Sequence, residues 1–221
     1  MSGSLVPALA PPEPDRDCPL CPRLAAFRDE WRSKEPTWHN APVANFGPPD
    51  ARLLIVGLAP GLRGANRTGR PFTGDYAGEL LYKTLVDFGF AAGRYEARFD
   101  DGLRLRDAMI ANGVRCVPPE NKPTPEEIRT CRQFLAPTIA SMPRLRIVLA
   151  LGRIAHDTTL AALGARATAY PFAHGAMHPV RPDLALADSY HCSRYNTNTG
   201  ALTPEMFRAV FASVRAYLGP A

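Results

Sequence analysis

The chain has 221 residues, of which 46% are hydrophobic and 21% are charged, as is typical of a globular protein that buries its own core. No apolar run approaches the roughly 20 residues of a membrane span, and the start of the chain lacks the basic and apolar regions of a signal peptide. These features exclude a membrane protein. We therefore expect a cytosolic protein, whose formal charge of +5 favours a polyanionic partner.

The first expected elements are a tail, a helix and a buried strand. Residues 1–16 are rich in proline and alanine, and we expect a mobile tail there, ahead of a single domain over residues 17–221. A helix is expected over residues 24–32. The apolar run at 52–58 is typical of a buried strand in a parallel sheet.

A long glycine-rich loop, GLAPGLRGANRTGRPFTGD, follows this strand over residues 57–75. Its glycines and prolines let the backbone approach a ligand and hold one shape. Phe72 offers a stacking face, and Asp75 is the only carboxylate of the loop. Three arginines would suit phosphate: Arg63, Arg67 and Arg70. The loop is neither a P-loop nor a dinucleotide-binding turn, but loops of this length in compact domains are usually functional or disordered. Its composition does not suit disorder, and we predict a site for an anionic, planar ligand.

Strands and helices alternate through the rest of the chain. The expected strands lie at 108–111, 146–151 and 184–190, and the expected helices at 77–88, 125–142, 153–163 and 204–218. Thr124 and Thr203 each precede a proline and are typical helix N-caps. This alternation predicts one α/β/α domain with a parallel, doubly wound sheet.

Polar groups follow three of the four expected strands. They are the glycine-rich loop, Asn112, and His191 with Ser193. Because the carboxyl ends of parallel strands share one edge of the sheet, we expect these groups to converge on a ligand site.

Four of the five cysteines fall into two pairs. Cys18 and Cys21 form a CPLC motif, Cys116 and Cys131 are separated by 14 residues, and Cys192 stands apart. In a reducing compartment such pairs indicate a metal site rather than disulfides. The cysteines alone leave zinc and an iron–sulfur cluster open, and they also leave open an iron–sulfur electron carrier.

Three motifs together resemble the family 5 (type B) branch of the uracil-DNA glycosylases, from Cys18 to the last helix. They are GLAPG with its extension GANRTGRPFTGD, the segment NGVRCVPPENKPTPEEI from Asn112, and SYHCSRYNTNTG from Ser189. The resemblance implies a three-layer α/β/α fold with a central four-stranded parallel sheet. It also implies a [4Fe–4S] cluster on the four paired cysteines and leaves Cys192 without a ligand role.

The first motif departs from other branches of that superfamily. Where those branches carry a carboxylate, this chain has Leu58 and Ala59, and the resemblance assigns the carboxylate to Asp75 instead. The bulky aromatic residue that excludes thymine in stricter enzymes corresponds to Gly61. We therefore expect a broader range of bases than uracil alone.

The expected chemistry is cleavage of an N-glycosidic bond in DNA after the base is flipped out of the stack. Asp75 is expected to act near the cationic sugar, and His191 to donate to O2 of the leaving base. Phe72 stacks on the base, and the Asn112 amide reads its edge. The expected base-binding set is Gly57, Ala59, Gly61, Phe72 and Asn112.

The loop after His191 is expected to engage DNA, which we expect to be double-stranded. The expected DNA contacts are Arg67, Ser193, Arg194, Tyr195 and Asn196, with Tyr195 or Asn196 filling the gap in the stack. We expect a monomeric enzyme that excises uracil, hypoxanthine and xanthine in base excision repair and leaves an abasic site. The alternative is a protein of the same fold that captures uracil-containing DNA without turnover.

Overall fold

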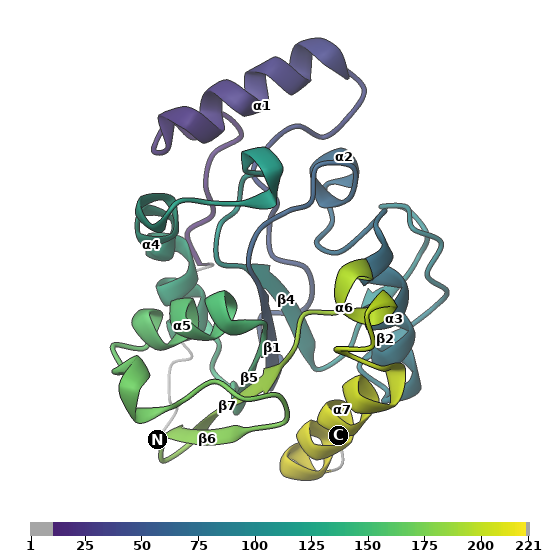
Figure 1. Cartoon of the computed structure of the whole chain (residues 1–221), viewed down its shortest axis with the longest axis vertical. Helices are drawn as coiled ribbons and strands as arrows, with labels where there is room; N and C mark the ends of the chain where they lie inside the picture. The colour runs from purple at the N-terminus through teal and green to yellow at the C-terminus, as the bar shows by residue number, and fades with distance from the viewer. Residues whose placement is uncertain (1–10, 220–221) are drawn as a thin grey trace, which may run out of the picture.

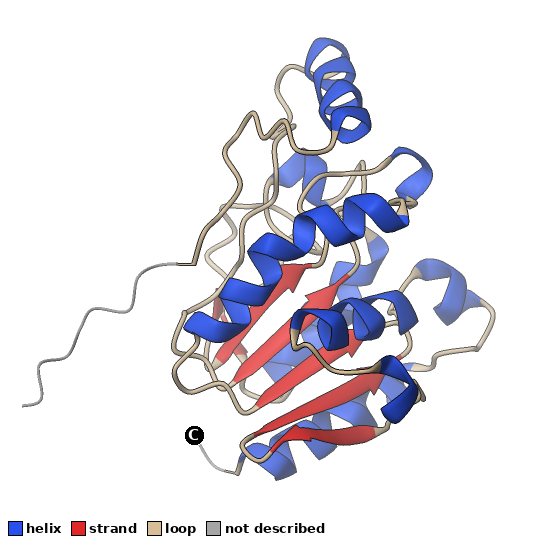
Figure 2. Ribbon diagram, turned by 90° about the vertical axis from the view of Figure 1, so that its left-hand side faces the viewer, coloured by secondary structure: helices blue, strands red, loops and turns tan. Residues whose placement is uncertain are grey.

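The computed structural model describes residues 11–219, so the first ten residues of the expected tail lie outside the described part. Its centre is a five-stranded sheet in the order β4-β1-β5-β7-β6 (Figures 1 and 2). The strands are β1 (Leu53–Gly57), β4 (Ala108–Asn112), β5 (Ile147–Leu151), β6 (Met177–Arg181) and β7 (Leu184–Ser189). The four expected strands are all present and parallel.

The fifth strand was not predicted from the sequence. β6 pairs antiparallel with β7 at the edge of the sheet, and its register shifts between Pro179 and Arg181. Its sequence, MHPVR, lacks the apolar run of a buried strand, and its residues are partly buried or exposed. Proline has no N–H to donate, and it is tolerated at an edge because one side of an edge strand forms no ladder hydrogen bonds.

Helices cover both faces of the sheet, as Figure 1 shows. The longer ones are α1 (Pro22–Lys34), α3 (Tyr76–Asp87), α4 (Pro125–Ser141), α5 (Arg153–Ala162) and α7 (Pro204–Leu218). Two short helices, α2 (Ala65–Thr68) and α6 (Arg194–Asn198), and a small hairpin of β2 (Ala91–Ala92) and β3 (Arg104–Leu105) complete the fold. Thr124 forms the expected capping box with Glu127, and Thr203 caps α7.

The strand sequences explain the three layers. Along β1, Leu53 and Ile55 belong to the core cluster that includes α3 and α7, whereas Leu54 and Val56 belong to the cluster that includes α4 and α5. Successive side chains of a strand point to opposite faces. An unbroken apolar run therefore fits a strand with a helical layer on each side, and all five residues of β1 are buried.

None of the helices in residues 11–219 is both long enough and apolar enough to cross a membrane.

Candidate active site

The parallel register brings the ends of four strands to one edge of the sheet. Gly57, the last residue of β1, lies beside Asn112, the last residue of β4. Leu151 at the end of β5 pairs with Ser189 at the end of β7, and the next residue, Gly152, lies against His191, with 3.6 Å between a Cβ built on the glycine and the His191 Cβ. The polar groups expected at the strand ends therefore share one edge of the sheet.

The side chains of Asn112 and Phe72 both lie against Gly57. Asn112 is 2% exposed, and its Oδ1 atom is buried without a hydrogen-bond partner among the described residues. A Cβ on Gly57 would lie 2.6 Å from both this oxygen and the Phe72 ring. Only glycine leaves room there for the amide and the ring together. A buried acceptor without a partner is costly, so this site suits a ligand that donates a hydrogen bond.

The Phe72 ring also faces His191. The two ring centroids are 5.9 Å apart with an interplanar angle of 29°. Burial lowers the pKa of His191 to about 4, so the imidazole is neutral near pH 7. A neutral imidazole can donate through one ring nitrogen and accept through the other, which suits contact with a polar ligand edge.

Asp75 supplies the carboxylate of this edge. It is the N-cap of α3, and its Oδ1 accepts a hydrogen bond from Gly78 N at 3.3 Å. Its Oδ2 faces the start of the glycine-rich loop, where a Cβ on Gly64 would overlap it and a Cβ on Gly61 would lie 3.0 Å away. Burial raises the pKa of Asp75 above its usual value, and the N–H groups of Gly78 and Ala77 partly offset that rise.

The segment after His191 folds into α6 rather than an open loop. Ser193 caps this helix by accepting from Asn196 N, and the Asn196 side chain donates to His191 O at 2.8 Å. Tyr195 projects into solvent and is 75% exposed. Arg194 is exposed too, with its guanidinium 5.4 Å from the centre of the Tyr76 ring.

The arginines of the glycine-rich loop differ from one another. Arg63 and Arg67 are exposed, and Arg67 lies near Gly74, whose carbonyl is 3.5 Å from its Nη2. Arg70 is 1% exposed and is bonded to Asp101 through both terminal nitrogens at 2.7 Å. The expectation that Arg70 suits phosphate is wrong, because its guanidinium is consumed by a buried ion pair.

The side chain of Ala59, another expected base-binding residue, packs against the apolar cluster that contains Cys116 and Cys131. Cys192 is fully buried against Ala77, with its sulfur 3.5 Å from the Ala77 carbonyl oxygen, and burial raises its pKa to about 12. A thiol with so high a pKa is a poor nucleophile near neutral pH.

The four paired cysteines line one pocket between α1, α4 and the segment after β4. Cys116 and Cys131 are buried, whereas Cys18 and Cys21 are half-buried. Two residues contact the sulfur atoms through nitrogen. The backbone N–H of Arg115 donates to Cys131 Sγ at 3.2 Å, and Arg28 Nη1 lies 4.0 Å from Cys116 Sγ. Four thiols with nitrogen donors around them fit a thiolate-bound metal centre.

Two buried arginines border this pocket. Arg28 is 3% exposed and Arg115 is 1% exposed, and the Nε atoms of both lack a hydrogen-bond partner in the described part of the chain. Arg115 is also paired with Glu13 at 3.2 Å, so this part of the expected tail contacts the domain. The pocket is thus rich in positive charge, which suits a site with an excess of thiolates.

A second buried polar cluster lies just before the His191 segment. His156 Nδ1 is 2.6 Å from Asp188 Oδ1, and His178 Nε2 is 3.2 Å from Asp188 Oδ2. The other nitrogen of His156 lies 2.8 Å from the Tyr170 carbonyl oxygen. These contacts join α5, β6 and β7 and hold the end of the strand that leads to His191.

Sequence reasoning missed Tyr95 and Asp101, which contact the glycine-rich loop from a distant segment. The Tyr95 hydroxyl bonds to Phe72 O and Gly74 N, and Asp101 pairs with Arg70. The segment at 95–105 has no periodic pattern. No local pattern predicts contacts between residues that lie more than 20 positions apart in the sequence.

Comparison with known proteins agrees with this arrangement. The family model of the uracil DNA glycosylase superfamily matches residues 44–215. The type-5 uracil-DNA glycosylase of Thermus thermophilus is 46% identical over 208 residues, which cover 91% of this chain and 94% of the relative. That of Pyrobaculum aerophilum is 38% identical over 92% of this chain and 90% of the relative.

A more distant group covers less of the chain. The type-4 uracil-DNA glycosylase of Archaeoglobus fulgidus is 35% identical over 51% of this chain and 49% of the relative. The full-length matches are thus to type-5 proteins, and the family-model match spans all five strands of the central sheet. On these grounds the chain belongs to the type-5 uracil-DNA glycosylases of the uracil DNA glycosylase superfamily.

Proposed function

We propose that this protein is a monofunctional DNA N-glycosylase that removes flipped-out uracil and leaves an abasic site in base excision repair. The observation that carries the proposal is Asn112 Oδ1, a buried acceptor without a partner in the described chain, set against the Phe72 ring. The type-5 relatives are named for the same activity. A pyrimidine with an N–H between two carbonyls would satisfy that oxygen and stack on the ring.

Base recognition follows from these two side chains. The Asn112 amide accepts the base N–H through Oδ1 and donates to the neighbouring carbonyl through its NH₂ group. Stacking on Phe72 repays part of the cost of flipping, at about 1–3 kcal/mol per base by analogy with single-strand binders. Gly57 and Gly61 keep side chains out of the space beside the base, and the backbone at Ala59 continues that wall.

Bond cleavage needs stabilisation of charge at two places. The C1′–N1 bond breaks with its electron pair on the uracil, so the sugar becomes cationic and O2 becomes anionic. The Asp75 carboxylate stabilises the sugar cation and accepts the proton of the attacking water, and its raised pKa suits a proton acceptor. The neutral His191 imidazole donates to O2.

The α6 segment is the proposed contact with double-stranded DNA. Ser193 and Arg194 bind phosphate, and Arg67 adds charge from the glycine-rich loop. Between the two wedge candidates, exposure favours Tyr195, because Asn196 already bonds to His191 O. One chain supplies all of these groups, which supports action as a monomer.

The proposed substrate range includes hypoxanthine and xanthine. Gly61 offers no side chain to exclude a larger base. The space beside it is bounded by Asp75, whose Oδ2 would lie 3.0 Å from a Cβ at Gly61. Removal of purines therefore depends on how far the base can sit from this carboxylate.

The proposed cofactor is a [4Fe–4S] cluster held by Cys18, Cys21, Cys116 and Cys131. The four cysteines line one pocket, and N–H groups lie beside two of the sulfur atoms, which supports a thiolate-bound metal group there. When bound, the cluster would join the N-terminal segment to the segment after Asn112.

The test is single-turnover release of free base from duplexes that carry uracil, hypoxanthine, xanthine or thymine. Uracil should be released fastest, with abasic sites formed in step with the free base. Iron and sulfide should be present at about four atoms of each per chain, as expected for a [4Fe–4S] cluster. Tight binding of uracil-containing DNA without base release would instead establish a capture protein of this fold.

A further inference from the structure

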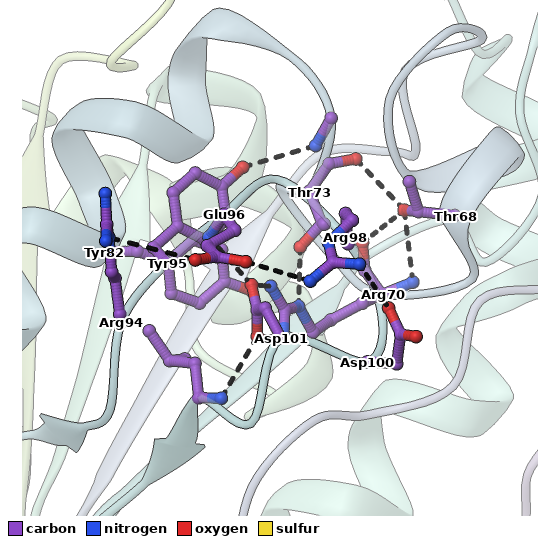
Figure 3. A network of polar contacts seen from close by, with 12 residues as sticks. Thr68, Arg70, Thr73, Tyr82, Arg94, Tyr95, Glu96, Arg98, Asp100 and Asp101 are labelled. Atoms are coloured by element: carbon purple, nitrogen blue, oxygen red, sulfur yellow. Dashed lines mark hydrogen bonds and ion pairs between the residues drawn. The ribbon is translucent and has the colours of Figure 1, made fainter.

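We propose that Tyr95, Arg70 and Asp101 are positioning residues that hold the Phe72 ring at the base-stacking distance. The proposal rests on the proposed function, in which Phe72 stacks on the flipped base. Figure 3 shows this network, which joins Arg70 of the glycine-rich loop to Asp101 and includes Tyr95. These residues do not touch the base; they act on it through the backbone of residues 70–74.

Phe72 needs such support because its backbone is strained. Its φ is +52°, in the left-handed region that non-glycine residues seldom occupy. A strained residue keeps its conformation only where its surroundings impose it. Relaxation of this φ would rotate the ring away from Gly57, against which it now lies.

Two phenols hold the backbone on either side of the ring. The Tyr82 hydroxyl donates to Pro71 O at 2.6 Å. The Tyr95 hydroxyl donates to Phe72 O at 3.3 Å and accepts from Gly74 N at 3.2 Å. Tyr95 thereby bridges the residue with the strained backbone and the residue just before Asp75.

Gly78 makes room for this bridge. A Cβ at that position would overlap both Phe72 O and the Tyr95 hydroxyl. Gly78 also donates its N–H to Asp75, so one turn of α3 contacts both Phe72 and the Asp75 carboxylate. The contact explains a glycine inside a helix, where glycine is otherwise unfavourable.

Arg70 and Asp101 attach the loop to the segment that carries Tyr95. Arg70 bonds to both carboxylate oxygens of Asp101 at 2.7 Å, and its Nε donates to Thr73 Oγ1 at 2.7 Å. Asp101 also accepts from the backbone N–H groups of Glu96 and Leu103. The Arg70 side chain is 1% exposed and that of Asp101 is 0% exposed, so water does not compete for these bonds.

Aromatic rings surround the Arg70 guanidinium and complete the support. Its central carbon lies 5.3 Å from the ring centre of Phe46, 5.2 Å from that of Tyr82 and 5.7 Å from that of Tyr95. Tyr82 and Tyr95 stack on each other at 4.7 Å. A Tyr95→Phe substitution keeps the ring stack and removes only the hydroxyl that holds Phe72 and Gly74.

The experiment is a double-mutant cycle between Tyr95→Phe and Phe72→Ala, read by single-turnover uracil release. Tyr95→Phe alone should lower the rate by about 10–100-fold, as expected for a displaced binding group. In the Phe72→Ala background the same change should lower the rate by less than about threefold, because the residue it acts through is gone. Thr73→Val, which removes the acceptor for Arg70 Nε, should show the same dependence on Phe72.

Thr159→Val is the matched control. It also removes one buried hydroxyl, which bonds to Ala155 O at 2.8 Å within α5. Its melting temperature should match that of Tyr95→Phe while its rate stays at the wild-type level. Equal rate losses for Tyr95→Phe with and without Phe72 would overturn the proposal. Absence of base release by the wild-type protein would instead overturn the proposed function.

Discussion

The buried polar groups on the two sides of the segment from Arg70 to Asp75 are of two kinds. On one side, Arg70, Asp101 and Tyr95 have partners within the chain. On the other side, Asn112 Oδ1 is equally buried and has no partner among residues 11–219. The first group is satisfied within the fold, whereas Asn112 Oδ1 is open to the proposed ligand. The difference separates residues that support the proposed site from residues that are proposed to bind in it.

The four-cysteine pocket belongs to the second kind. The Nε atoms of Arg28 and Arg115 are buried beside it without a hydrogen-bond partner in the described chain. Leaving a buried donor unpaired costs about 1–3 kcal/mol. Asn112 Oδ1 lies at the proposed base site, and these two Nε atoms lie beside the proposed iron–sulfur site.

The comparison predicts that breaking the network of Arg70, Asp101 and Tyr95, whose members have partners within the chain, mainly lowers stability. Arg70→Met leaves the Asp101 carboxylate buried without its partner and should lower the free energy of unfolding by about 3–5 kcal/mol. Urea denaturation measures the loss. The matched control is Arg67→Met, which makes the same substitution at an exposed position in the same loop and should change stability by less than about 0.5 kcal/mol. Similar losses for both variants would contradict the distinction.

Substitution of residues that are proposed to contact the ligand should lower activity and leave stability nearly unchanged. His191→Ala should lower the uracil release rate by about 10²–10³-fold, the usual effect of losing one donor to a developing oxyanion. Hypoxanthine has no O2, so its release should fall much less. Single-turnover rates on both bases measure the effect, and equal losses would exclude the O2 contact.

Asp75→Asn should lower the release of both bases, because each passes through the same cationic sugar. Asparagine caps a helix as well as aspartate does, so α3 should keep its N-cap and the protein its melting temperature. The variant therefore removes the charge and little else. Rates near the wild-type value would show that the carboxylate is not the catalytic group.

The pH dependence of the rate should identify the same carboxylate. Because burial raises the pKa of Asp75, its charge is lost at a higher pH than for an exposed aspartate, and the rate should fall as pH decreases through that raised pKa. Asp75→Asn should remove this limb of the profile. His191→Ala should retain this limb of the profile when hypoxanthine is the substrate, since the pKa of His191 is already lowered to about 4. A limb that persists in Asp75→Asn would belong to another group.

The smallest effect is expected outside both buried regions, at Arg194. This arginine is exposed on α6, so Arg194→Ala should weaken binding to any duplex and reduce the salt slope by about one. Arg181→Ala, at the opposite end of the sheet, is the control and should leave the slope unchanged. If Arg194→Ala lost discrimination between bases and kept the salt slope unchanged, Arg194 would contact bases instead of phosphate.

The three layers of this protein could be predicted from its amino-acid sequence alone. Four buried strands could be predicted because β1, β4, β5 and β7 are short apolar runs, and local caps such as Thr124 marked where helices begin. The convergence of Gly57, Asn112 and His191 followed from one rule, that parallel strands end at the same edge. Periodicity and capping are local properties, so a single chain is enough to show them.

The sequence does not show which residues of the glycine-rich loop are free to contact a ligand and which are bonded within the fold. That distinction requires the three-dimensional structure. Arg67 and Arg70 lie three residues apart in the same basic loop, yet one is exposed and the other is buried against Asp101. Likewise, Gly61 and Gly64 make room for the Asp75 carboxylate, and neither glycine has a positive φ. These roles depend on partners far along the chain, and whether a charged side chain binds a ligand or an internal partner is decided by what folding brings beside it.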